Sequence, residues 1–404
     1  GYAFYSLKGI LPHIQDQAAM RSFLKGYQGL EQNQFFSGLG PAYIFFLITF
    51  LVNIAILNCG IKGGIEVMCR IAMPVLFVFG LFLVARVLTL GAPDSARPDW
   101  NITNGLGFLW NPDFSALKSA KVWLAAAGQI FFTLSVGIGV ILTYASYLSR
   151  GDDVVLSGLT AVSMNEIAEV IVGGCIVIPA AFVFFGPVDI RAIAQQGAFD
   201  LGFVTMPLVL GKIPWPAIFS FCWFALLFLA GITSSVSLAQ PAVAFLEDEF
   251  DISRKKAVAI FAAIGFVLCQ PAIFWLGRGV VNELDFWDGT FCLVLFGTVE
   301  AILFAWIFGI DKAWEEIHHG ADIRIPRFYK FIIKYVTPLF LLVILGAWLF
   351  QEGLPTMLMK GVADTDKPFV LGTRAGLVGL FLLLAFLVKL AWRRRALSIR
   401  KGSS

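Results

Sequence analysis

Long apolar stretches recur along the chain, separated by short polar loops. Each is about as long as a helix that crosses the hydrocarbon core of a bilayer, roughly 20 residues. One stretch is interrupted near its middle by glycines and hydroxyls, and with it the pattern predicts about nine membrane-spanning helices. The unbroken stretches cover residues 43–59, 67–90, 156–184, 218–246, 257–276, 290–308, 333–349 and 373–388, and the interrupted one covers residues 122–148.

The span at residues 218–246 contains the polar sequence AGITSSVSLAQ at residues 230–240. A spanning helix has no reason to carry such groups toward lipid. The hydroxyls of Thr233 and Ser234 follow Ala230 by three and four residues, so in a helix they can lie beside its carbonyl oxygen. Three neutral oxygens suit a small hard cation. The alternative is hydrogen bonding of Ser and Thr between membrane helices.

The interrupted span contains FFTLSVGIG at residues 131–139. Gly137 and Gly139 permit an unwound turn, which is tolerated at membrane depth only where it faces protein or a water-filled cavity. Amides and carbonyls freed there can bind a carboxylate and a cation. Close helix crossing at small residues is the alternative. A nucleotide-binding glycine loop is excluded, because no strand precedes the motif.

A third polar group lies in the next span. Asn165 and Glu169 are four residues apart and share a helix face, so an amide oxygen and a carboxylate can address one internal site. Alternatively, Glu166 or Glu169 bonds only a neighbouring backbone group or an arginine. Glu300 stands alone in a later span and is interpreted as a protonated or hydrogen-bonded structural carboxyl.

Composition fits a polytopic helical membrane protein: 58% hydrophobic and 14% charged residues, with a mean hydropathy of +0.82. The net charge of +3 needs no nucleic-acid partner. The six cysteines have no paired spacing, which indicates packing roles. No nucleophile–base pair or zinc-ligand spacing is present, so the sequence favours neither an enzyme nor a bound cofactor.

Basic residues fall on alternate loops and at the C-terminus, which the positive-inside rule assigns to the cytoplasm. With an odd number of spans, Gly1 is then expected near the outside, and because the chain starts without Met we expect the true N-terminus to be missing. The basic residues are Lys62, Arg70, Arg254, Lys255, Lys256, Lys312, Arg324, Arg327, Lys330, Lys334, Arg393, Arg394 and Arg395. The acidic residues of the opposite loops are Asp94, Asp99, Glu283, Asp285 and Asp288.

The chain resembles bacterial amino-acid members of the neurotransmitter:sodium symporter family, of the leucine-transporter type. The resemblance runs from Gly1 to about Arg395 and is carried by sequence blocks that are specific in combination. The blocks are GQIFFTLSVGIG (128–139), LTYASY (142–147), SGLTAVSMNEIAEV (157–170), AGITSSVSLAQPAVAFLEDE (230–249), DFWDGT (285–290) and IFGIDKAWEEI (307–317).

This resemblance implies an all-α fold with an inverted pair of five-helix repeats plus two further helices, forming a single transmembrane transporter domain over residues 1–404. Residues 1–90 correspond to the end of the first repeat, 122–308 to the second repeat, and 333–392 to the last two helices. Gly1 corresponds to a position near the end of the third helix, so we expect the first two helices and most of the third to be absent.

The resemblance also implies roles for individual residues. One sodium site would use Thr133 and Asn165, and a second would use Ala230, Thr233 and Ser234. The residues matching the substrate pocket are Phe132, Thr133, Ser135, Ile138, Ser234 and Leu238. The residues matching the outer gate are Gln129 and Asp285, and those matching the inner gate are Tyr147, Gln240 and Asp248.

Three further positions carry implied roles. Gly64 and Pro74 match a glycine and a proline that let water reach the inner sodium site as their helix unwinds. Glu169 stands where chloride-dependent relatives carry a small neutral residue. Its carboxylate would replace chloride in compensating the sodium charge, so chloride-independent transport with proton counter-transport is expected.

The predicted function is sodium-coupled uptake of a small neutral, hydrophobic amino acid by alternating access. Sodium ions would be the coupling ions, and the expected partners are the amino acid and membrane lipid; a homodimer is left open. The predicted location is the inner cell membrane, with a cytoplasmic C-terminus. The competing interpretation is an amino-acid-binding membrane sensor or channel-like module that does not transport.

Overall fold

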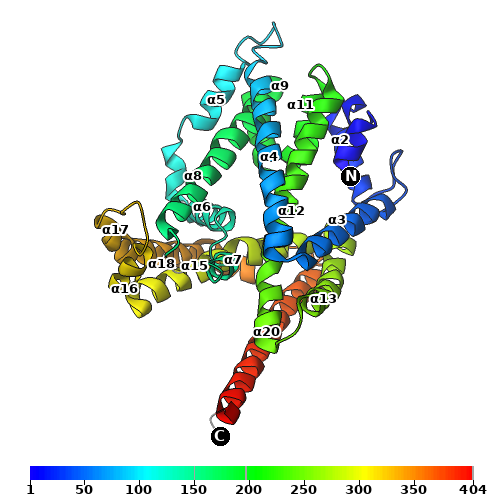
Figure 1. Ribbon diagram of the computed structural model, residues 1–404. Coiled ribbons are helices and arrows are strands. Elements are labelled where there is room, and N and C mark those ends of the chain that lie inside the picture. Colours follow the sequence, from blue (N-terminus) through cyan, green and yellow to red (C-terminus); the bar gives the residue numbers. More distant parts are fainter. Residues whose placement is uncertain (150, 196–197, 403–404) are drawn as a thin grey trace. The chain divides into compact units, whose positions relative to one another are not determined.

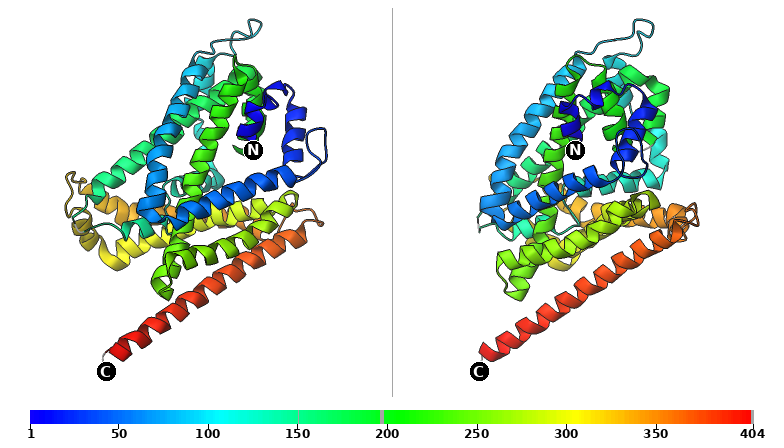
Figure 2. Two further views of the ribbon diagram at one scale, coloured as in Figure 1. Left: turned by 45° about the vertical axis from the view of Figure 1, so that its right-hand side comes forward. Right: turned by 90° about the vertical axis from the view of Figure 1, so that its right-hand side faces the viewer.

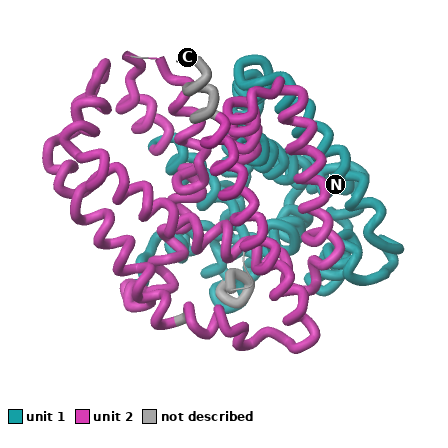
Figure 3. Tube along the Cα trace, turned by 90° about the horizontal axis from the view of Figure 1, so that it is seen from below, with its two compact units in different colours: residues 1–113, 163–237 teal, residues 114–162, 238–404 magenta. Residues whose placement is uncertain are grey.

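The computed structural model describes residues 1–149, 151–195 and 198–402, which form helices and connecting loops without a strand among them. Contacts between Cα atoms divide the chain into two compact units (Figure 3). Unit 1 comprises Gly1–Asp113 and Ser163–Ser237, and unit 2 comprises Phe114–Val162 and Leu238–Ser404. Two of the three boundaries fall inside helices, because α8 (Val154–Glu166) and α12 (Pro216–Phe250) each contribute to both units.

Among the described residues, eight helical stretches are long and apolar enough to cross a membrane. Each contains or overlaps one of the unbroken stretches predicted from sequence, so those predictions are confirmed. The eight are Gly40–Asn58, Ile61–Leu88, Val154–Ile190, Pro216–Phe250, Arg254–Phe274, Val280–Ile317, Phe328–Gln351 and Lys367–Arg394. The interrupted stretch forms two shorter helices, α6 (Ala120–Thr133) and α7 (Val140–Ala145).

Several spanning stretches change helix type along their length. In unit 1, the π-helical turn η2 (Ile61–Ile65) leads into α4 (Glu66–Leu88), and η4 (Ile167–Gly173) separates α8 from α9 (Gly174–Gln195). In unit 2, η7 (Trp287–Phe291) separates α14 (Val280–Phe286) from α15 (Cys292–Ile302). Short π-helical turns occur frequently at functional sites.

Unit 1 is organised around α9. The short helix α5 (Ile102–Trp110) makes its most extensive contact with α9, and α4 packs beside α9 as well (Figures 1 and 2). Gly105 of α5 allows the close approach, because a Cβ there would lie 3.0 Å from the backbone of Pro179. Helices α2 (Gln17–Tyr27) and α3 (Gly40–Asn58) also belong to unit 1, and a buried aromatic cluster that includes Phe23 fills its core.

Unit 2 is built around α6. Helix α6 packs against η7, α15 and α18 (Thr337–Trp348). Leu124, Val294 and Trp348 are buried in the shared core. Helix α13 (Arg254–Phe274) and the long C-terminal helix α20 (Lys367–Gly402) complete this unit (Figure 2). Only the backbone of Arg395 is described, so its predicted role as a cytoplasmic anchor lies outside the described side chains.

Asp153 joins two loops of unit 2. Its carboxylate accepts hydrogen bonds from the backbone N–H groups of Leu156 at the start of α8 and of Asp322, both at 2.8 Å. These bonds favour the charged form and hold the pKa of Asp153 below its ordinary value. The segment after α7 is therefore tied to the loop that follows α16 (Ile310–Ile317).

Arg374 of α20 binds Glu283 of α14, and all three nitrogens of its guanidinium group donate hydrogen bonds. Its Nε and Nη2 donate to the two carboxylate oxygens of Glu283 at 2.7 and 3.2 Å. Nη1 and Nη2 also donate to the carbonyls of Met357 and Thr356. The indole N–H of Trp287 donates to the same carboxylate at 2.8 Å. The Arg374–Glu283 pair is largely buried, with side chains 18% and 14% exposed. Loss of either charge would therefore leave the other buried without a counter-charge.

Replacing Arg374 by alanine is predicted to destabilise the protein by about 3 kcal/mol, because the buried carboxylate of Glu283 loses its counter-charge. The measurement is thermal unfolding in detergent or nanodiscs. Arg278→Ala is the matched control, since the Arg278–Asp366 pair is more exposed and should contribute less than about 1 kcal/mol. Similar losses of stability in the two variants would show that the Arg374–Glu283 pair stabilises the protein no more than an exposed ion pair does.

Candidate functional site

The interruption predicted at residues 131–139 is present in unit 2. Helix α6 ends at Thr133 and α7 begins at Val140. Between them, Ser135, Gly137 and Gly139 have φ values of +58°, +79° and +75°. Glycine adopts this left-handed backbone without steric cost, whereas Ser135 does so against its side-chain preference. The two glycines therefore account for most of the break.

Several backbone groups of the break find partners nearby. The amides of Ser135 and Val136 donate back to the carbonyls of Phe132 and Phe131, at 3.1 and 2.8 Å. The amide of Gly137 donates to Oε2 of Glu300 at 3.1 Å. Within the described part of the chain, the amides of Ile138 and Gly139 have no hydrogen-bond partner. These two groups remain available to a ligand or to water.

The break lies directly against α15. A Cβ on Gly137 would lie 2.7 Å from the carbonyl oxygen of Leu293 and 3.0 Å from the nitrogen of Gly297. In turn, a Cβ on Gly297 would lie 2.7 Å from the ring of Phe131. Glycine is required at position 137, where the close atoms are backbone, whereas a side chain at position 297 would have to displace the Phe131 ring. The same approach brings the Gly137 amide within reach of Glu300 on α15.

Glu300 is hydrogen-bonded, in agreement with the interpretation from sequence, but its partner was not predicted. Its isolation in an apolar span suggested a structural carboxyl, and in the structure it accepts a hydrogen bond from the unwound backbone of the break. The sequence did contain a lone carboxyl in one span and a glycine-containing break with free amides in another, and these two features could have been paired. Sequence spacing alone does not connect residues 163 positions apart.

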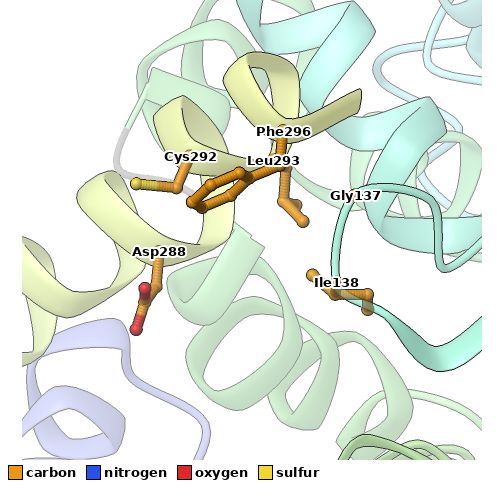
Figure 4. Close-up of a pocket in the computed structure, with 6 residues that line it drawn as sticks. All are labelled: Gly137, Ile138, Asp288, Cys292, Leu293 and Phe296. Atoms are coloured by element: carbon orange, nitrogen blue, oxygen red, sulfur yellow. The ribbon is translucent and has the colours of Figure 1, made fainter. Parts of the chain in front are cut away.

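A recess of about 400 Å³ opens beside the break (Figure 4). Its walls are apolar apart from the Cys292 thiol and the Asp288 carboxylate, and in the close-up Ile138 lies on the side opposite Asp288. The lining residues are Gly137, Ile138, Asp288, Cys292, Leu293 and Phe296. The unwound segment and the π-helical turn η7 therefore border one cavity.

The residues predicted to line a substrate pocket divide between the two units. Unit 2 holds Phe132 and Thr133 at the end of α6, Ser135 and Ile138 in the break, and Leu238 on α12. Ser234 belongs to unit 1. Phe132 and Leu238 are 48% and 45% exposed. Within unit 2, four of the predicted residues thus cluster along one short segment, while Leu238 comes from a distant part of the sequence.

Two of the predicted cation-binding oxygens lie together on α12. The Thr233 hydroxyl lies 3.0 Å from the carbonyl oxygen of Ala230 and 3.0 Å from that of Leu229. Its single proton can be donated to Leu229, which leaves its lone pairs and the Ala230 carbonyl available to a cation. Ser234 is exposed and has no hydrogen-bond partner among the described residues. The geometry suits a small cation with neutral oxygen ligands.

The neighbouring hydroxyl of Ser235 has a different role. It donates to Oδ1 of Asn53 on α3 at 2.6 Å, and the Asn53 amide group donates to the carbonyl of Thr49 at 2.9 Å. This pair links α3 to α12 through interhelical hydrogen bonding, which was the alternative explanation for the polar sequence. The interhelical explanation therefore applies to Ser235, while cation binding by Thr233 and Ser234 stays a prediction. Asn53, a lone amide in an apolar span, was not singled out from sequence.

Asn165 and Glu169 are brought together at the start of η4. The side-chain amide of Asn165 lies 3.4 Å from Oε2 of Glu169, and both residues are half-buried. Glu166 is exposed. The four-residue spacing is retained although the helix changes here from α to π.

The predicted inner-gate residues Tyr147 and Gln240 lie in contact. The amide of Gln240, which is fully buried, donates to the Tyr147 hydroxyl at 3.4 Å. Arg254 donates to the Gln240 oxygen at 2.9 Å and to Glu247 at 3.0 Å. Asp248 is adjacent to Glu247 on α12. Sequence reasoning counted Arg254 only as a loop charge, so its place in this network is new.

The predicted outer-gate residues are Gln129 on α6 and Asp285 on α14, both exposed. Helix α6 approaches η7, the turn that directly follows α14, since a Cβ on Gly128 would lie 3.3 Å from the Thr290 side chain. In unit 1, Gly64 lies in η2 and Pro74 in the interior of α4. A Cβ on Gly64 would collide with the carbonyl oxygen of Ile56, so this glycine permits tight packing against α3.

The sequence model described as the Sodium:neurotransmitter symporter family matches residues 15–360. An uncharacterised sodium-dependent transporter of Methanocaldococcus jannaschii is 32% identical over 292 residues, covering 71% of this chain and 56% of the relative. The sodium-dependent nutrient amino acid transporter 1 of Drosophila willistoni is 26% identical over 311 residues, covering 74% of this chain and 45% of the relative. The chain thus spans about half the length of these two curated relatives.

The fold is similar to the crystal structure of MhsT in complex with L-phenylalanine. The TM-score is 0.71 at 26% sequence identity, covering 86% of this chain and 75% of that chain. This likeness confirms the predicted leucine-transporter type of all-α membrane fold.

Replacing Glu300 by leucine is predicted to destabilise the protein by about 1–3 kcal/mol, because the Gly137 amide loses its acceptor in a segment that cannot rewind. Thermal unfolding in nanodiscs measures the effect. Glu300→Gln keeps an acceptor oxygen and should retain most of the stability. If the leucine variant is as stable as the glutamine variant, the hydrogen bond to Gly137 does not hold the break in place.

Proposed function

Because the chain belongs to the sodium:neurotransmitter symporter family, we propose that the protein couples inward sodium movement to the uptake of a neutral, hydrophobic amino acid. The observation that carries this proposal is the interruption between α6 and α7, whose amides at Ile138 and Gly139 have no partner among the described residues. A broken membrane helix exposes backbone groups that bind charged ends of small solutes. The phenylalanine bound to MhsT supports a hydrophobic substrate.

The substrate-binding residues in this proposal are Phe132, Thr133, Ser135, Ile138, Ser234 and Leu238. The break would bind the charged backbone end of the amino acid, because it offers amides without the entropy cost of an ordered flexible side chain. Apolar residues such as Phe132 and Leu238 would bind the side chain. Both are substantially exposed in their unit, which leaves their surfaces available to a ligand.

Ala230, Thr233 and Ser234 are proposed to bind one sodium ion. The 3.0 Å separation of the Thr233 hydroxyl from the Ala230 carbonyl supports this, because neighbouring ligands of a small cation lie about this far apart. Neutral oxygen ligands bind sodium weakly enough for the ion to be released during each transport cycle. A site built from carboxylates would bind a monovalent cation with a larger electrostatic penalty for release.

Thr133 and Asn165 are proposed to contribute to a second sodium site, with Glu169 supplying the compensating charge. The contact between the Asn165 amide and Glu169 supports a shared electrostatic role. A fixed carboxylate lowers the cost of holding a cation in a poorly solvated interior, so chloride is not needed. The proposal includes proton counter-transport, in which a proton is carried outward in the return step.

Alternating access would use Gln129 and Asp285 as the outer gate and Tyr147, Gln240 and Asp248 as the inner gate. Gly64 and Pro74 would let α4 unwind to admit water from the inside. The basic C-terminus is proposed to be cytoplasmic, in an inner cell membrane. The contact between Gln240 and Tyr147, extended by Arg254 and Glu247, supports a closed inner gate.

Vesicles containing this chain joined to the first three helices of a close relative are predicted to accumulate a hydrophobic amino acid against its gradient when sodium is higher outside. Accumulation requires coupling, which a sensor or channel lacks, so this measurement separates the two functions. Dissipating the sodium gradient with an ionophore should stop uptake. Binding without accumulation, or equilibration that ignores sodium, would favour the sensor or channel interpretation.

Thr233→Val is predicted to weaken sodium binding at least tenfold, because it preserves the side-chain shape but removes a ligand oxygen. Ser234→Ala should have a comparable effect. Sodium titration of amino-acid binding provides the measurement. Ser237→Ala is the control, since residue 237 lies one turn beyond the proposed ligands. Equal sodium affinities in Thr233→Val, Ser234→Ala and Ser237→Ala would contradict the assignment.

Glu169→Ser is predicted to make uptake depend on external chloride and to abolish proton counter-transport. The serine removes the fixed charge, and a bound chloride would restore it. Uptake is measured with chloride or gluconate as the anion, together with a pH-sensitive dye inside the vesicles. The proposed role of Glu169 is wrong if the wild-type protein already needs chloride, or if the serine variant remains indifferent to it.

A further inference from the structure

Three acidic residues in the stretch from α14 to α15, Glu283, Asp288 and Glu300, differ in whether their carboxylates have hydrogen-bond partners. Glu283 is bound by Arg374 and Trp287, and Glu300 accepts the Gly137 amide. Asp288 has no hydrogen-bond or ion-pair partner among the described residues, although it lines the recess. Asp288 is exposed, but a ligand that fills the recess would exclude water from its carboxylate, and a hydrogen bond donated to an ionised carboxylate is stronger than one between neutral groups.

Asp285 precedes Asp288 by three residues and is also exposed without a partner in the described part of the chain. Residues at this spacing are neighbours on a helix surface, and two negative charges there repel each other. Asp285 does not line the recess and is already assigned to the outer gate. A cationic donor bound at Asp288 would also reduce this repulsion, whereas a neutral donor would only satisfy the carboxylate.

The recess has the size and surface for an amino-acid side chain. Its volume of about 400 Å³ falls within the range of small-molecule sites. Ile138, Leu293 and Phe296 give it apolar walls. Ile138 also belongs to the substrate-binding residues proposed above, which connects the recess to the break. A side chain that starts at the break would pass these walls before it reaches Asp288 (Figure 4).

We propose that the recess selects substrates whose side chain is apolar along its length and ends in a hydrogen-bond donor, and that Asp288 accepts that donor. This inference rests on the proposed function, because it takes the break as the site of the amino-acid backbone. The donor can be neutral, as in an indole N–H or a phenol O–H, or cationic, as in an ammonium group. All three present an N–H or O–H to a carboxylate oxygen.

Three matched pairs of amino acids test the inference, since the members of each pair differ chiefly in the terminal donor. The pairs are tyrosine with phenylalanine, tryptophan with naphthylalanine, and lysine with norleucine. Sodium-dependent binding of all six is measured with the purified protein by calorimetry. We expect the donor-bearing member of at least one pair to bind about tenfold to a hundredfold tighter than its partner, as for a hydrogen bond to a charged acceptor.

Asp288→Ala should reduce that ratio to about one while leaving the affinities of phenylalanine, naphthylalanine and norleucine nearly unchanged. Asp288→Asn preserves the shape and one acceptor oxygen, so it should retain part of a preference for a neutral donor but lose a preference for lysine. Asp364→Ala is the matched control, because Asp364 is an exposed acid that pairs with Lys367 outside the recess. Thermal unfolding of each variant reports whether it is folded.

Ratios near one for all three pairs in the wild-type protein would overturn the inference. So would a preference that persists unchanged in Asp288→Ala. Sodium-dependent binding of the three amino acids without a donor would leave the proposed function intact in either case. If none of the six binds in a sodium-dependent manner, the proposed function itself fails, and the inference fails with it.

Discussion

The requirement that every backbone polar group find a partner inside a membrane governs how this chain can be interrupted. A helix satisfies its own amides, so a break at membrane depth needs acceptors from elsewhere. Glu300 supplies one for Gly137, and the absence of a Cβ at Gly137 and Gly297 lets the two segments approach closely enough. The amides of Ile138 and Gly139 have no partner among the described residues, so they are the backbone groups that the proposed function assigns to ligand binding.

The hydroxyl groups of α12 also differ in whether their hydrogen bonds leave oxygen lone pairs available to a ligand. Thr233 has two carbonyl acceptors for one proton, so its oxygen can remain a ligand while its hydrogen bond persists. Ser235 instead ties α12 to Asn53 of α3. One polar segment therefore combines the proposed cation-binding residues with an interhelical hydrogen bond, and different hydroxyl groups serve the two roles. The electrostatic counterpart is Glu169, a carboxylate held beside an amide within a π-helical turn.

The sequence was sufficient to predict the spanning helices and the break, because hydropathy and glycine placement are local signals. Local spacing also predicted that Thr233 lies beside Ala230 and Asn165 beside Glu169. Contacts between residues far apart in the sequence could not be predicted from local spacing. Glu300 with Gly137, Arg374 with Glu283, and Arg254 with Gln240 each depend on helix packing that one sequence does not specify. The roles of the site residues themselves stay predictions.

Hydrogen–deuterium exchange of the protein in nanodiscs tests most directly whether the break and α12 bind the coupling ion and the amino acid. Exchange is compared in sodium chloride with phenylalanine and in potassium chloride at equal ionic strength. Binding should slow exchange in peptides covering residues 133–140 and 226–237, while a peptide from residues 367–390 stays unchanged. Equal exchange in the two salts, or a uniform change in all three peptides, would contradict the assignment of the site to these segments.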